Sequence, residues 1–313
     1  MDKNSRIIIT GAAGCLGQNT ILLLKEKGYN NILALDKNHD NIKVLQQINP
    51  DLETIETDLA IPGKWQNAFH GGRVLLLMHA KITGLYLKEF QCDNESATIQ
   101  VIEAAKKHKI PYIVHISSTV VISKADDYYT NTKKAQEKLV EKSGIDYCIL
   151  RPALMFGWFD KKHLGWLSRF MAKTPVFPIP GNGQYLRQPL YVRDMTAIVI
   201  AAMEQKPIGK IFNITGRENI NYIDIIRRIK KVKGLHTLII NIPYWLFDFL
   251  LNVYALFFKN PPFTSQQLSA LTAGDYFEGD SWSEIFNIPG TTLEQAFYET
   301  FACGEFSKIV LKP

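Results

Sequence analysis

A glycine-rich turn after the first strand-like run is the feature of this sequence that most restricts its fold. The run Arg6–Thr10 is apolar and rich in β-branched residues, and Gly11, Gly14 and Gly17 follow it before a helical pattern begins. In a strand–turn–helix unit, Gly11 permits the tight turn, Gly14 lets the backbone approach a pyrophosphate, and Gly17 lets the helix lie against the sheet. The N-terminus of the helix then offers backbone N–H groups and a partial positive charge to the anion. The sequence therefore predicts a dinucleotide site here.

The expected second strand ends at Asp36, and this residue bears on the choice between NAD and NADP. An acidic side chain at this distance beyond the glycine turn accepts hydrogen bonds from the hydroxyls of the adenosine ribose. A carboxylate there also repels a 2′-phosphate, so we expect NAD rather than NADP. Lys37, the next residue, tempers that preference because of its positive charge.

The first half of the chain alternates short β-branched runs with longer stretches of helical period. This alternation is typical of a parallel sheet wrapped by helices. We therefore predict an α/β fold with a Rossmann-type doubly wound parallel sheet. The strands are expected at Arg6–Thr10, Asn31–Asp36, Leu52–Thr57, Arg73–His79, Tyr112–Ser117 and Asp146–Leu150.

The longest expected helix runs over about Tyr86–His108. Ile99, Ile102 and Ala105 recur in it at spacings of three and six, so we expect them on its apolar face. The helix is expected to end before Pro111, because the residue that precedes a proline disfavours helical backbone.

Proline and glycine crowd the sequence just beyond residue 150, and apolar helices recur only later. We therefore divide the chain into an NAD-binding Rossmann domain, residues 1–150, and a smaller, mainly substrate-binding region, residues 151–313. The strand-like run Lys210–Thr215 is expected to return to the sheet. The apolar run Ile242–Phe258 is shorter than the roughly 20 residues of a spanning helix. We expect a buried or lid-forming helix there, with a helix lying in the membrane interface as the alternative.

Tyr129 and Lys133 stand four residues apart at the start of a helical segment, so their side chains share one face of it. A phenol ionises near pH ~10, which is too high for a base at neutral pH. A neighbouring ammonium favours the phenolate and lowers that pKa. We expect Tyr129 to take or give a proton at a hydroxyl or carbonyl while a nicotinamide takes or gives hydride. Such a pair also arises by chance in helices, but here it follows a dinucleotide motif.

Hydroxyl side chains follow the fifth expected strand at Ser117, Ser118 and Thr119. Ligands of α/β sheets bind at the carboxyl ends of the strands, so one of these hydroxyls could orient the substrate oxygen. Serines after a strand are also common turn residues. The three hydroxyls therefore indicate a substrate site only in combination with Tyr129 and Lys133.

Composition and charge argue against several other classes of protein. Of the 313 residues, 46% are apolar and 21% charged, as in ordinary globular proteins. The 36 basic and 30 acidic side chains leave a net charge of +6 without the dense basic stripe of a nucleic-acid binder. Cys15, Cys92, Cys148 and Cys303 lie far apart without metal-ligand spacing, so we expect reduced thiols and no metal site. With no transmembrane or signal segment evident at the N-terminus, we expect a cytoplasmic protein with a small-molecule substrate, for which peripheral membrane contact stays open.

Over most of its length the chain resembles the extended short-chain dehydrogenase/reductases, the NAD-dependent epimerase/dehydratase family. The matching motifs are TGAAGCLG (Thr10–Gly17), Asp58-Leu59, His79-Ala80, ISST (Ile116–Thr119), YTNTK (Tyr129–Lys133), LRPALMFG (Leu150–Gly157) and GNGQYLRQPLYVRD (Gly181–Asp194). Together these motifs are specific for the family, though not for one reaction.

The resemblance implies a role for each matching residue. Thr119 would be the hydroxyl partner of Tyr129, with Ser118 as the alternative. Lys133 would also bind the nicotinamide ribose, and Arg187 would bind the diphosphate of a nucleotide sugar. Members often dimerise through a helix pair that includes the tyrosine helix, so we expect a homodimer. The residues implied in cofactor binding are Gly11, Gly14, Cys15, Leu16, Gly17, Asp36, Asp58, Leu59, His79, Ala80, Ser117, Lys133 and Pro152.

Three departures from the family pattern bear on the reaction. Nucleotide-sugar members usually carry a second arginine before a Gly-Asp pair near the C-terminus, whereas here Leu271-Thr272-Ala273 precedes Gly274-Asp275. The connection between the hydroxyl cluster and the tyrosine, which shapes the active-site wall, is short. Val120 and Val121 stand where dehydratases carry an Asp-Glu pair, which argues against dehydration.

We therefore expect an NAD-dependent oxidoreductase or epimerase acting on a secondary alcohol or ketone, with a nucleotide sugar as the leading candidate substrate. The alternative is a hydroxysteroid-dehydrogenase-like enzyme for a hydrophobic alcohol. Ile242–Phe258 followed by Pro261-Pro262 resembles that branch, and Trp158 and Trp166 would add apolar surface. A non-catalytic dinucleotide-binding protein is the remaining interpretation, and the presence of both members of the Tyr-Lys pair argues against it.

Overall fold

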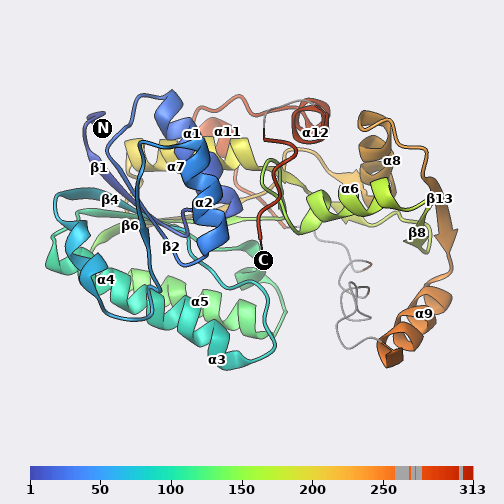
Figure 1. The fold of residues 1–313 in the computed structure, drawn as a ribbon, viewed down its shortest axis with the longest axis horizontal. Coiled ribbons are helices and arrows are strands. Elements are labelled where there is room, and N and C mark those ends of the chain that lie inside the picture. The colour runs from blue at the N-terminus through green and yellow to red at the C-terminus, as the bar shows by residue number, and fades with distance from the viewer. Residues whose placement is uncertain (258–267, 269–271, 273–276, 303–305, 313) are drawn as a thin grey trace.

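The computed structural model describes residues 1–257, 268, 272, 277–302 and 306–312. Its central strands are β1 (Arg6–Thr10), β2 (Ile32–Asp36), β3 (Glu53–Glu56), β4 (Gly72–Leu77), β5 (Tyr112–Ile116), β6 (Asp146–Pro152) and β11 (Lys210–Ile214). They form one sheet in the order β11-β6-β5-β4-β1-β2-β3, and all neighbouring pairs are parallel (Figure 1). Because the chain winds outward in both directions from the middle of the sheet, the predicted Rossmann-type doubly wound fold is confirmed.

The predicted strands lie close to the observed ones. β1 has the predicted bounds, and the others differ from prediction by one or two residues at an end. β11 returns to the sheet beside β6, as we expected for this part of the second half. Side chains alternate across each strand, so Ile7 and Ile9 pack on one face while Ile8 packs on the other. The central strands are therefore buried on both faces, which explains their continuous apolar runs.

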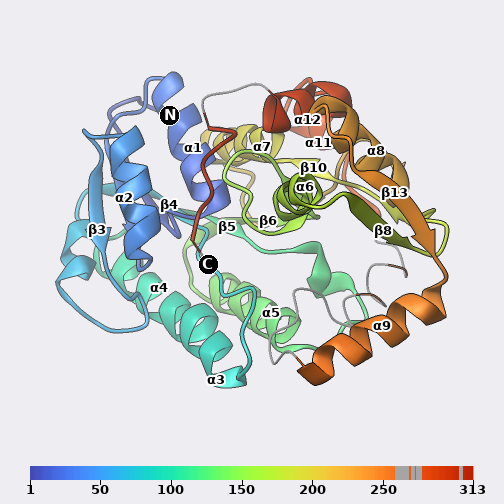
Figure 2. The ribbon, with the colours of Figure 1, turned by 45° about the vertical axis from the view of Figure 1, so that its right-hand side comes forward.

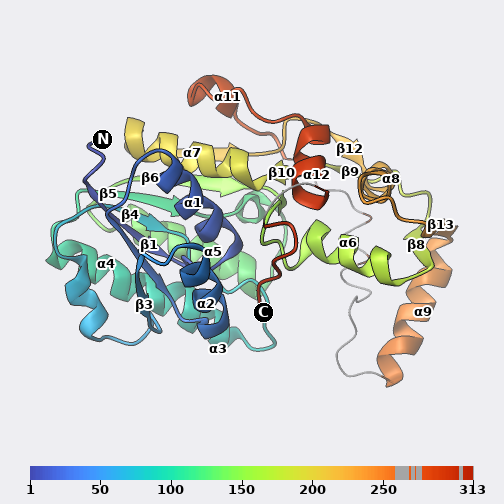
Figure 3. The ribbon, with the colours of Figure 1, turned by 45° about the horizontal axis from the view of Figure 1, so that its top comes forward.

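Two layers of helices enclose the sheet (Figures 1 and 3). The first layer consists of α1 (Cys15–Glu26), α2 (His39–Ile48) and α7 (Val192–Gln205). The second consists of α4 (Ala97–Lys107), α5 (Tyr128–Glu141) and the short 3₁₀ helix η1 (Lys64–Phe69). The carboxyl ends of the parallel strands meet at one edge of the sheet, where ligands of this fold bind.

The long helix predicted over Tyr86–His108 is a run of three segments. They are α3 (Leu87–Phe90), the π-helical η2 (Gln91–Ser96) and α4. Ile102 and Ala105 are buried as expected, but Ile99 is 40% exposed, so the prediction was wrong for that residue. The buried stripe of α4 instead includes Thr98, because positions 98, 101, 102 and 105 recur at helical spacing.

The second region packs beside the carboxyl edge of the sheet (Figure 2). Its described residues form the two-stranded sheets β10 with β7, β12 with β9 and β13 with β8. Its core is continuous with the cluster under α1, α2 and α7. Its elements are β7 (Met155–Phe156), α6 (His163–Lys173), β8 (Val176–Pro180), β9 (Leu186–Arg187), β10 (Leu190–Tyr191), β12 (Ile220–Asn221), α8 (Tyr222–Val232), β13 (Leu238–Ile242), α9 (Tyr244–Phe257), α11 (Trp282–Ile285) and α12 (Leu293–Phe301).

Helix α9 forms where the apolar run Ile242–Phe258 predicted a helix, but it is not buried. Trp245 is 69% exposed and Phe249 is 59% exposed. In Figures 1–3 the helix projects from the end of the second region. Within the described part of the chain, no helix has both the length and the apolar character needed to cross a bilayer.

Candidate active site

Backbone atoms lie close around the glycine turn between β1 and α1. Gly11 has a φ of +68°, and a Cβ there would lie 2.8 Å from Cα and N of His79. At Gly17 a Cβ would lie 2.5 Å from the carbonyl oxygens of Gly11 and Ala12. Gly14 is the N-cap of α1, and no side chain of the described residues caps this end of the helix. The turn therefore leaves a cradle at a helix N-terminus that fits a pyrophosphate.

Asp36 ends β2 beside this cradle. Its carboxylate accepts hydrogen bonds from the backbone N–H groups of Ala13 and Asn38, each at 3.0 Å. Burial raises the pKa of Asp36, while these backbone hydrogen bonds act to lower it. The carboxylate therefore ties the glycine turn to the end of β2, in the position predicted for the adenosine ribose.

Lys37 next to Asp36 is held by other carboxylates. Its ammonium donates to Asp93 at 2.5 Å and lies 3.9 Å from Asp58. These carboxylates partly neutralise the positive charge of Lys37. Lys37 therefore offsets less of the repulsion between Asp36 and a 2′-phosphate than we expected from the sequence. Leu59, the other half of the predicted adenine-side pair, is buried.

His79 follows β4, and both of its ring nitrogens have threonine partners. Nδ1 lies 2.9 Å from Oγ1 of Thr10, and Nε2 lies 3.1 Å from Oγ1 of Thr98. Burial, and then the charge of Lys133, lower the pKa of His79 to about 3. The imidazole is therefore neutral at physiological pH. Ala80, which follows it, is exposed at the edge of the sheet.

Lys133 of α5 is fully buried. Its ammonium donates to the carbonyl of Ile116 at 2.8 Å and to Oε1 of Gln136 at 2.7 Å. The amide of Gln136 donates in turn to Thr98 at 2.8 Å, so the lysine is connected to His79 through two side chains. Burial lowers the pKa of Lys133 to about 7. The lysine can therefore lose its charge near neutral pH.

Tyr129 lies in the first turn of α5. Burial raises the pKa of Tyr129, an interaction with the side chain of Ser118 lowers it, and the charge of Asp127 raises it. The ammonium of Lys133 donates to the carbonyl at the carboxyl end of β5. That Lys133 lowers the pKa of Tyr129 during the reaction stays a prediction.

The two candidate hydroxyl partners of Tyr129 have different surroundings. Ser118 precedes the 3₁₀ helix η3 (Thr119–Ile122), and its side chain acts on the pKa of Tyr129. Thr119 is buried, and its hydroxyl donates to the carbonyl of Pro152 at 3.5 Å. Which of the two is the partner of Tyr129 stays a prediction.

Ser117, at the end of β5, has a buried hydroxyl with no hydrogen-bond partner among the described residues. Buried polar atoms without partners are rare in native proteins, so a ligand atom is a candidate partner for this hydroxyl. Together with the glycine cradle and Asp36, the Ser117 hydroxyl fits a dinucleotide stretched along the carboxyl edge of the sheet.

Cys15 at the start of α1 donates to the carbonyl of Trp158 at 3.4 Å, which joins the two regions beside the cradle.

Arg187 lies in the second region on β9, and its side chain is buried. Its charge acts on Tyr222, whose pKa is raised by burial and lowered by the guanidinium. Its predicted contact with a diphosphate stays a prediction. The segment in which the sequence lacks a second arginine, Leu271–Asp275, lies outside the described residues apart from Thr272.

Sequence reasoning missed the buried polar side chains behind Lys133. Thr98 and Gln136 lie on helices whose pattern gave no reason to single them out. His115 lies within the apolar run of β5, and a histidine in such a run could have been recognised from the sequence as a buried polar residue. Its pKa is lowered by burial and then by Lys133 and His79, and neither ring nitrogen has a partner among the described residues.

The C-terminal segment, residues 306–312, is the other feature that was missed. It runs between α2 and α6 (Figures 1 and 3). The backbone of Lys312 exchanges two hydrogen bonds with Asn41, at 2.7 and 3.1 Å, and accepts a third from Lys161 at 2.6 Å. Lys161 also acts on the charge of Asp36, so the segment lies near the predicted ribose site. A pocket of 390 Å³ opens between this segment, Lys161 and Lys162.

No cluster of three or more histidine, cysteine, aspartate or glutamate side chains able to hold a metal ion occurs among the residues that the structure describes.

Comparison with known proteins identifies the family. The model of the NAD dependent epimerase/dehydratase family matches residues 7–215, from the first strand to the end of β11. The chain belongs to this family. The predictions of an enzyme, of the extended short-chain dehydrogenase/reductase type and of NAD as its cofactor are thereby confirmed.

Among characterised proteins, the chain is similar to enzymes named for lipid substrates. It is 24% identical over 245 residues to a ceramide reductase of Caulobacter vibrioides, covering 77% of this chain and 75% of the relative. It is also 24% identical to the decarboxylating sterol-4-alpha-carboxylate 3-dehydrogenase of Mus musculus, covering 96% of this chain and 91% of the relative.

Among solved structures, the fold is similar to nucleotide-sugar epimerases. The UDP-glucose 4-epimerase of Thermotoga maritima, solved with UDP-glucose, has a TM-score of 0.75 at 17% identity and covers 94% of this chain and 96% of its own. The UDP-glucuronic acid 4-epimerase of Bacillus cereus, solved with NAD, has a TM-score of 0.69 at 22% identity over the same shares. At these identities the likeness establishes the fold.

Proposed function

We propose that this protein oxidises a secondary alcohol or reduces a ketone with NAD or NADH, and that Tyr129 is its acid/base. The observation that carries the proposal is that the side chains of Tyr129 and Ser118 interact beside the buried Lys133 and the hydroxyl of Ser117, which is unpartnered among the described residues. A substrate oxygen that contacts both the phenol and the Ser118 hydroxyl would account for this arrangement. A ketone or alcohol oxygen needs a proton donor or acceptor together with a second hydrogen bond to fix its position.

Each residue of the site would then have a separate task. Ser118 donates a hydrogen bond to the substrate oxygen and holds it against Tyr129. Tyr129 takes the proton of an alcohol during oxidation and returns it to a ketone during reduction. Bound NAD supplies the hydride acceptor, and NADH the hydride donor, for the reacting carbon. Lys133 and Ser117 would hold the nicotinamide side, and Asp36 the adenosine ribose.

We further propose a hydrophobic substrate of lipid type. A ceramide reductase and a sterol dehydrogenase are among the relatives that match this chain in sequence over three quarters of it or more. In the structure, α9 presents exposed aromatic side chains at the end of the region that packs beside the sheet edge. Residues 151–313 would mainly bind the substrate, as the sequence indicated.

A nucleotide sugar is the second candidate, and it rests on Arg187. A buried guanidinium beside Tyr222 suits a diphosphate, because it offers a fixed fork of donors out of water. An epimerase would take the hydride from the substrate carbon onto NAD and return it to the other face of the resulting ketone, with no net change in cofactor. A dehydrogenase would instead accumulate NADH.

The test begins with purified protein, NAD and NADP, and two substrate panels: ceramides and sterols in one, and UDP-, GDP- and dTDP-sugars in the other. NADH formed with the ceramide and sterol panel assigns a hydrophobic alcohol, whereas NADH or an epimerised sugar formed with the second panel assigns a nucleotide sugar. Tyr129→Phe should then lower turnover at least about a hundredfold, because the acid/base is lost while the ring remains. Tyr128→Phe, an exposed neighbour, is the matched control and should retain activity. Unchanged turnover in the Tyr129 variant would contradict the mechanism.

A further inference from the structure

The surface of α9 is apolar and aromatic over much of its length. Tyr244, Trp245, Phe249, Leu250 and Tyr254 are all exposed. Monomeric proteins rarely leave such a contiguous apolar surface in water, and an apolar helix without cover marks a contact with another phase or molecule. The helix has 14 residues, so at about 1.5 Å per residue it is too short to span a bilayer.

The strand that leads into α9 extends this apolar surface. β13 ends at Ile242, and Pro243 alone separates it from the helix. Among the residues that the structure describes, β13 pairs with β8 alone, which leaves its other edge without a strand partner, and Leu238 on it is 59% exposed. In Figures 1–3, α8, β13 and α9 lie at the same end of the molecule.

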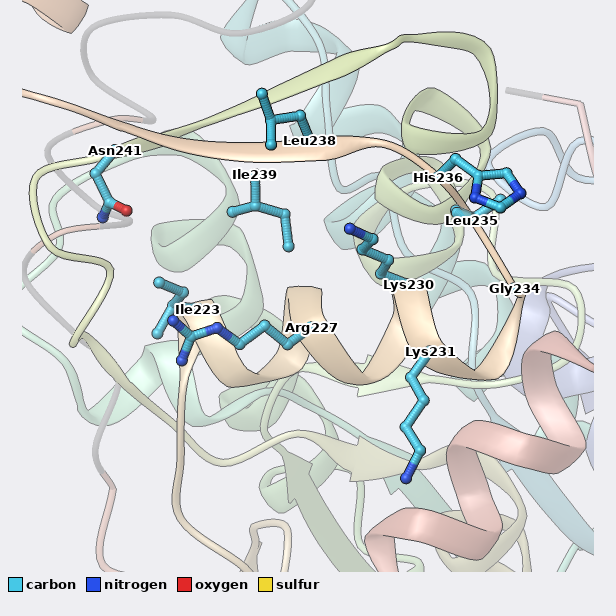
Figure 4. Close-up of a pocket in the computed structure, with 10 residues that line it drawn as sticks. All are labelled: Ile223, Arg227, Lys230, Lys231, Gly234, Leu235, His236, Leu238, Ile239 and Asn241. Carbon is cyan, nitrogen blue, oxygen red and sulfur yellow. The ribbon is translucent and has the colours of Figure 1, made fainter.

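Basic side chains lie beside the same strand. A pocket of 580 Å³ between α8 and β13 is lined by Arg227, Lys230, Lys231 and His236. Figure 4 shows Lys230 directed from α8 toward Ile239 of β13. Arg227 is paired with Asp224, but Lys230 and Lys231 form no ion pair with any described residue. This end of the molecule therefore combines exposed aromatic rings with positive charge that is not neutralised.

We propose that α9 and β13, together with the basic pocket of α8, bind the surface of a membrane that contains anionic lipids. Tyrosine and tryptophan favour the level of the lipid headgroups, and phenylalanine and leucine bury in the acyl boundary below. Lysines near the surface add attraction to anionic headgroups. A second copy of this chain fits less well, because a symmetric contact would bring the two basic pockets toward each other. Membrane binding goes beyond the reaction proposed above and does not require it.

The experiment is co-sedimentation of the full chain with vesicles, without nucleotide or substrate. One set of vesicles is phosphatidylcholine alone, and the other mixes phosphatidylcholine with phosphatidylglycerol. We expect binding to the mixed vesicles that weakens as salt is added. Replacing Trp245 and Phe249 together by glutamate should weaken it at least about tenfold, because two large apolar side chains no longer enter the interface.

A charge variant and a control separate the two parts of this surface. Lys230→Glu with Lys231→Glu should weaken binding to the mixed vesicles by roughly fivefold or more for each lysine, and should leave any binding to neutral vesicles unchanged. Ile208→Glu is the matched control, because Ile208 is 56% exposed and lies outside this surface. Circular dichroism and NAD titration establish that each variant is folded.

Three outcomes would overturn the proposal. The wild-type chain could fail to sediment with either kind of vesicle. It could bind equally well after both double substitutions. Gel filtration could also reveal a dimer that the Trp245/Phe249 variant dissociates while vesicles bind nothing, which would assign the surface to a second copy of the chain.

Discussion

The chemistry of this site depends, at the scale of single residues, on the surroundings of one buried lysine. Lys133 is enclosed with His79 and His115, and burial lowers the pKa of all three. A charge in this place loses its hydration, so each group resists taking a proton. The carbonyl of Ile116 and the amide of Gln136 replace part of that hydration for the lysine.

The lowered pKa of Lys133 predicts how stability changes with pH. Between pH ~7 and pH ~10.5 an unfolded lysine holds a proton that the folded one has released, so this lysine makes the free energy of unfolding rise with pH across that window. The cost of burying the charge is present in full below pH ~7. Lys133→Met removes this group. The free energy of unfolding of the variant minus that of the wild type should therefore fall by at most about 1.4 kcal/mol per pH unit between pH ~7 and pH ~10.5.

Urea unfolding of both proteins without nucleotide, at several pH values from neutral to mildly alkaline, measures this difference. The histidines of the cluster are present in both proteins, so their titration largely cancels. A difference that stays constant with pH would mean that Lys133 keeps its charge in the folded state.

Ser118 and Thr119 make distinct predictions although they are adjacent in the chain. Ser118→Ala should lower kcat by about a hundredfold, because the substrate oxygen loses the donor that holds it against Tyr129. Thr119→Val removes a hydroxyl that faces the carbonyl of Pro152, so kcat should stay within roughly tenfold. Steady-state kinetics on the substrate identified above compares the two. The opposite ranking would restore Thr119 as the partner.

At the scale of elements, the unit formed by β1, the glycine turn and α1 tolerates few substitutions at its glycines. Gly17→Ala would place a methyl group 2.5 Å from two backbone carbonyl oxygens, so α1 would have to move away from the turn. We expect NAD to bind at least about tenfold more weakly, because the backbone N–H groups of the cradle shift with the helix. Isothermal titration with NAD measures the change.

Gly28→Ala provides the control for this prediction. Gly28 follows the C-terminus of the same helix with a φ of +84°, and a Cβ there would meet nothing within 4 Å. The substitution should lower stability by about 1 kcal/mol through backbone strain and leave NAD affinity unchanged. Equal losses of affinity in both variants would show that general destabilisation, rather than the shape of the cradle, is responsible.

At the scale of the whole molecule, the C-terminal segment joins parts that are distant in sequence. It connects α2, through Asn41, to the lysines that precede α6. Leu311 in this segment is buried and its neighbour Val310 is exposed. Leu311→Ala should therefore lower the free energy of unfolding by about 2–3 kcal/mol, whereas Val310→Ala should change it by less than about 0.5 kcal/mol. Denaturant unfolding tests this, and equal effects would mean that the segment does not pack here in solution.

The elements of the sheet were predictable from the sequence because their causes are local. Apolar runs of β-branched residues form strands, and glycines at a fixed spacing form the turn that holds a phosphate. Ile99 was misplaced because spacing alone does not define which edge of an apolar stripe meets the core. For α9, hydropathy predicted a helix, but its exposure depends on what the rest of the chain leaves uncovered.

The sequence by itself determined the α/β fold, the glycine cradle with Asp36, and the placement of Tyr129 and Lys133 one helical turn apart, since each rests on spacing within a single element or turn. Only the tertiary structure decided which groups bind the ammonium of Lys133 and the hydroxyl of Thr119. Those contacts depend on rotation at the end of β5 and on partners such as Gln136 and Pro152. Contacts between residues far apart in the chain leave no periodic trace in the sequence, and this is the physical reason that the fold had to be known first.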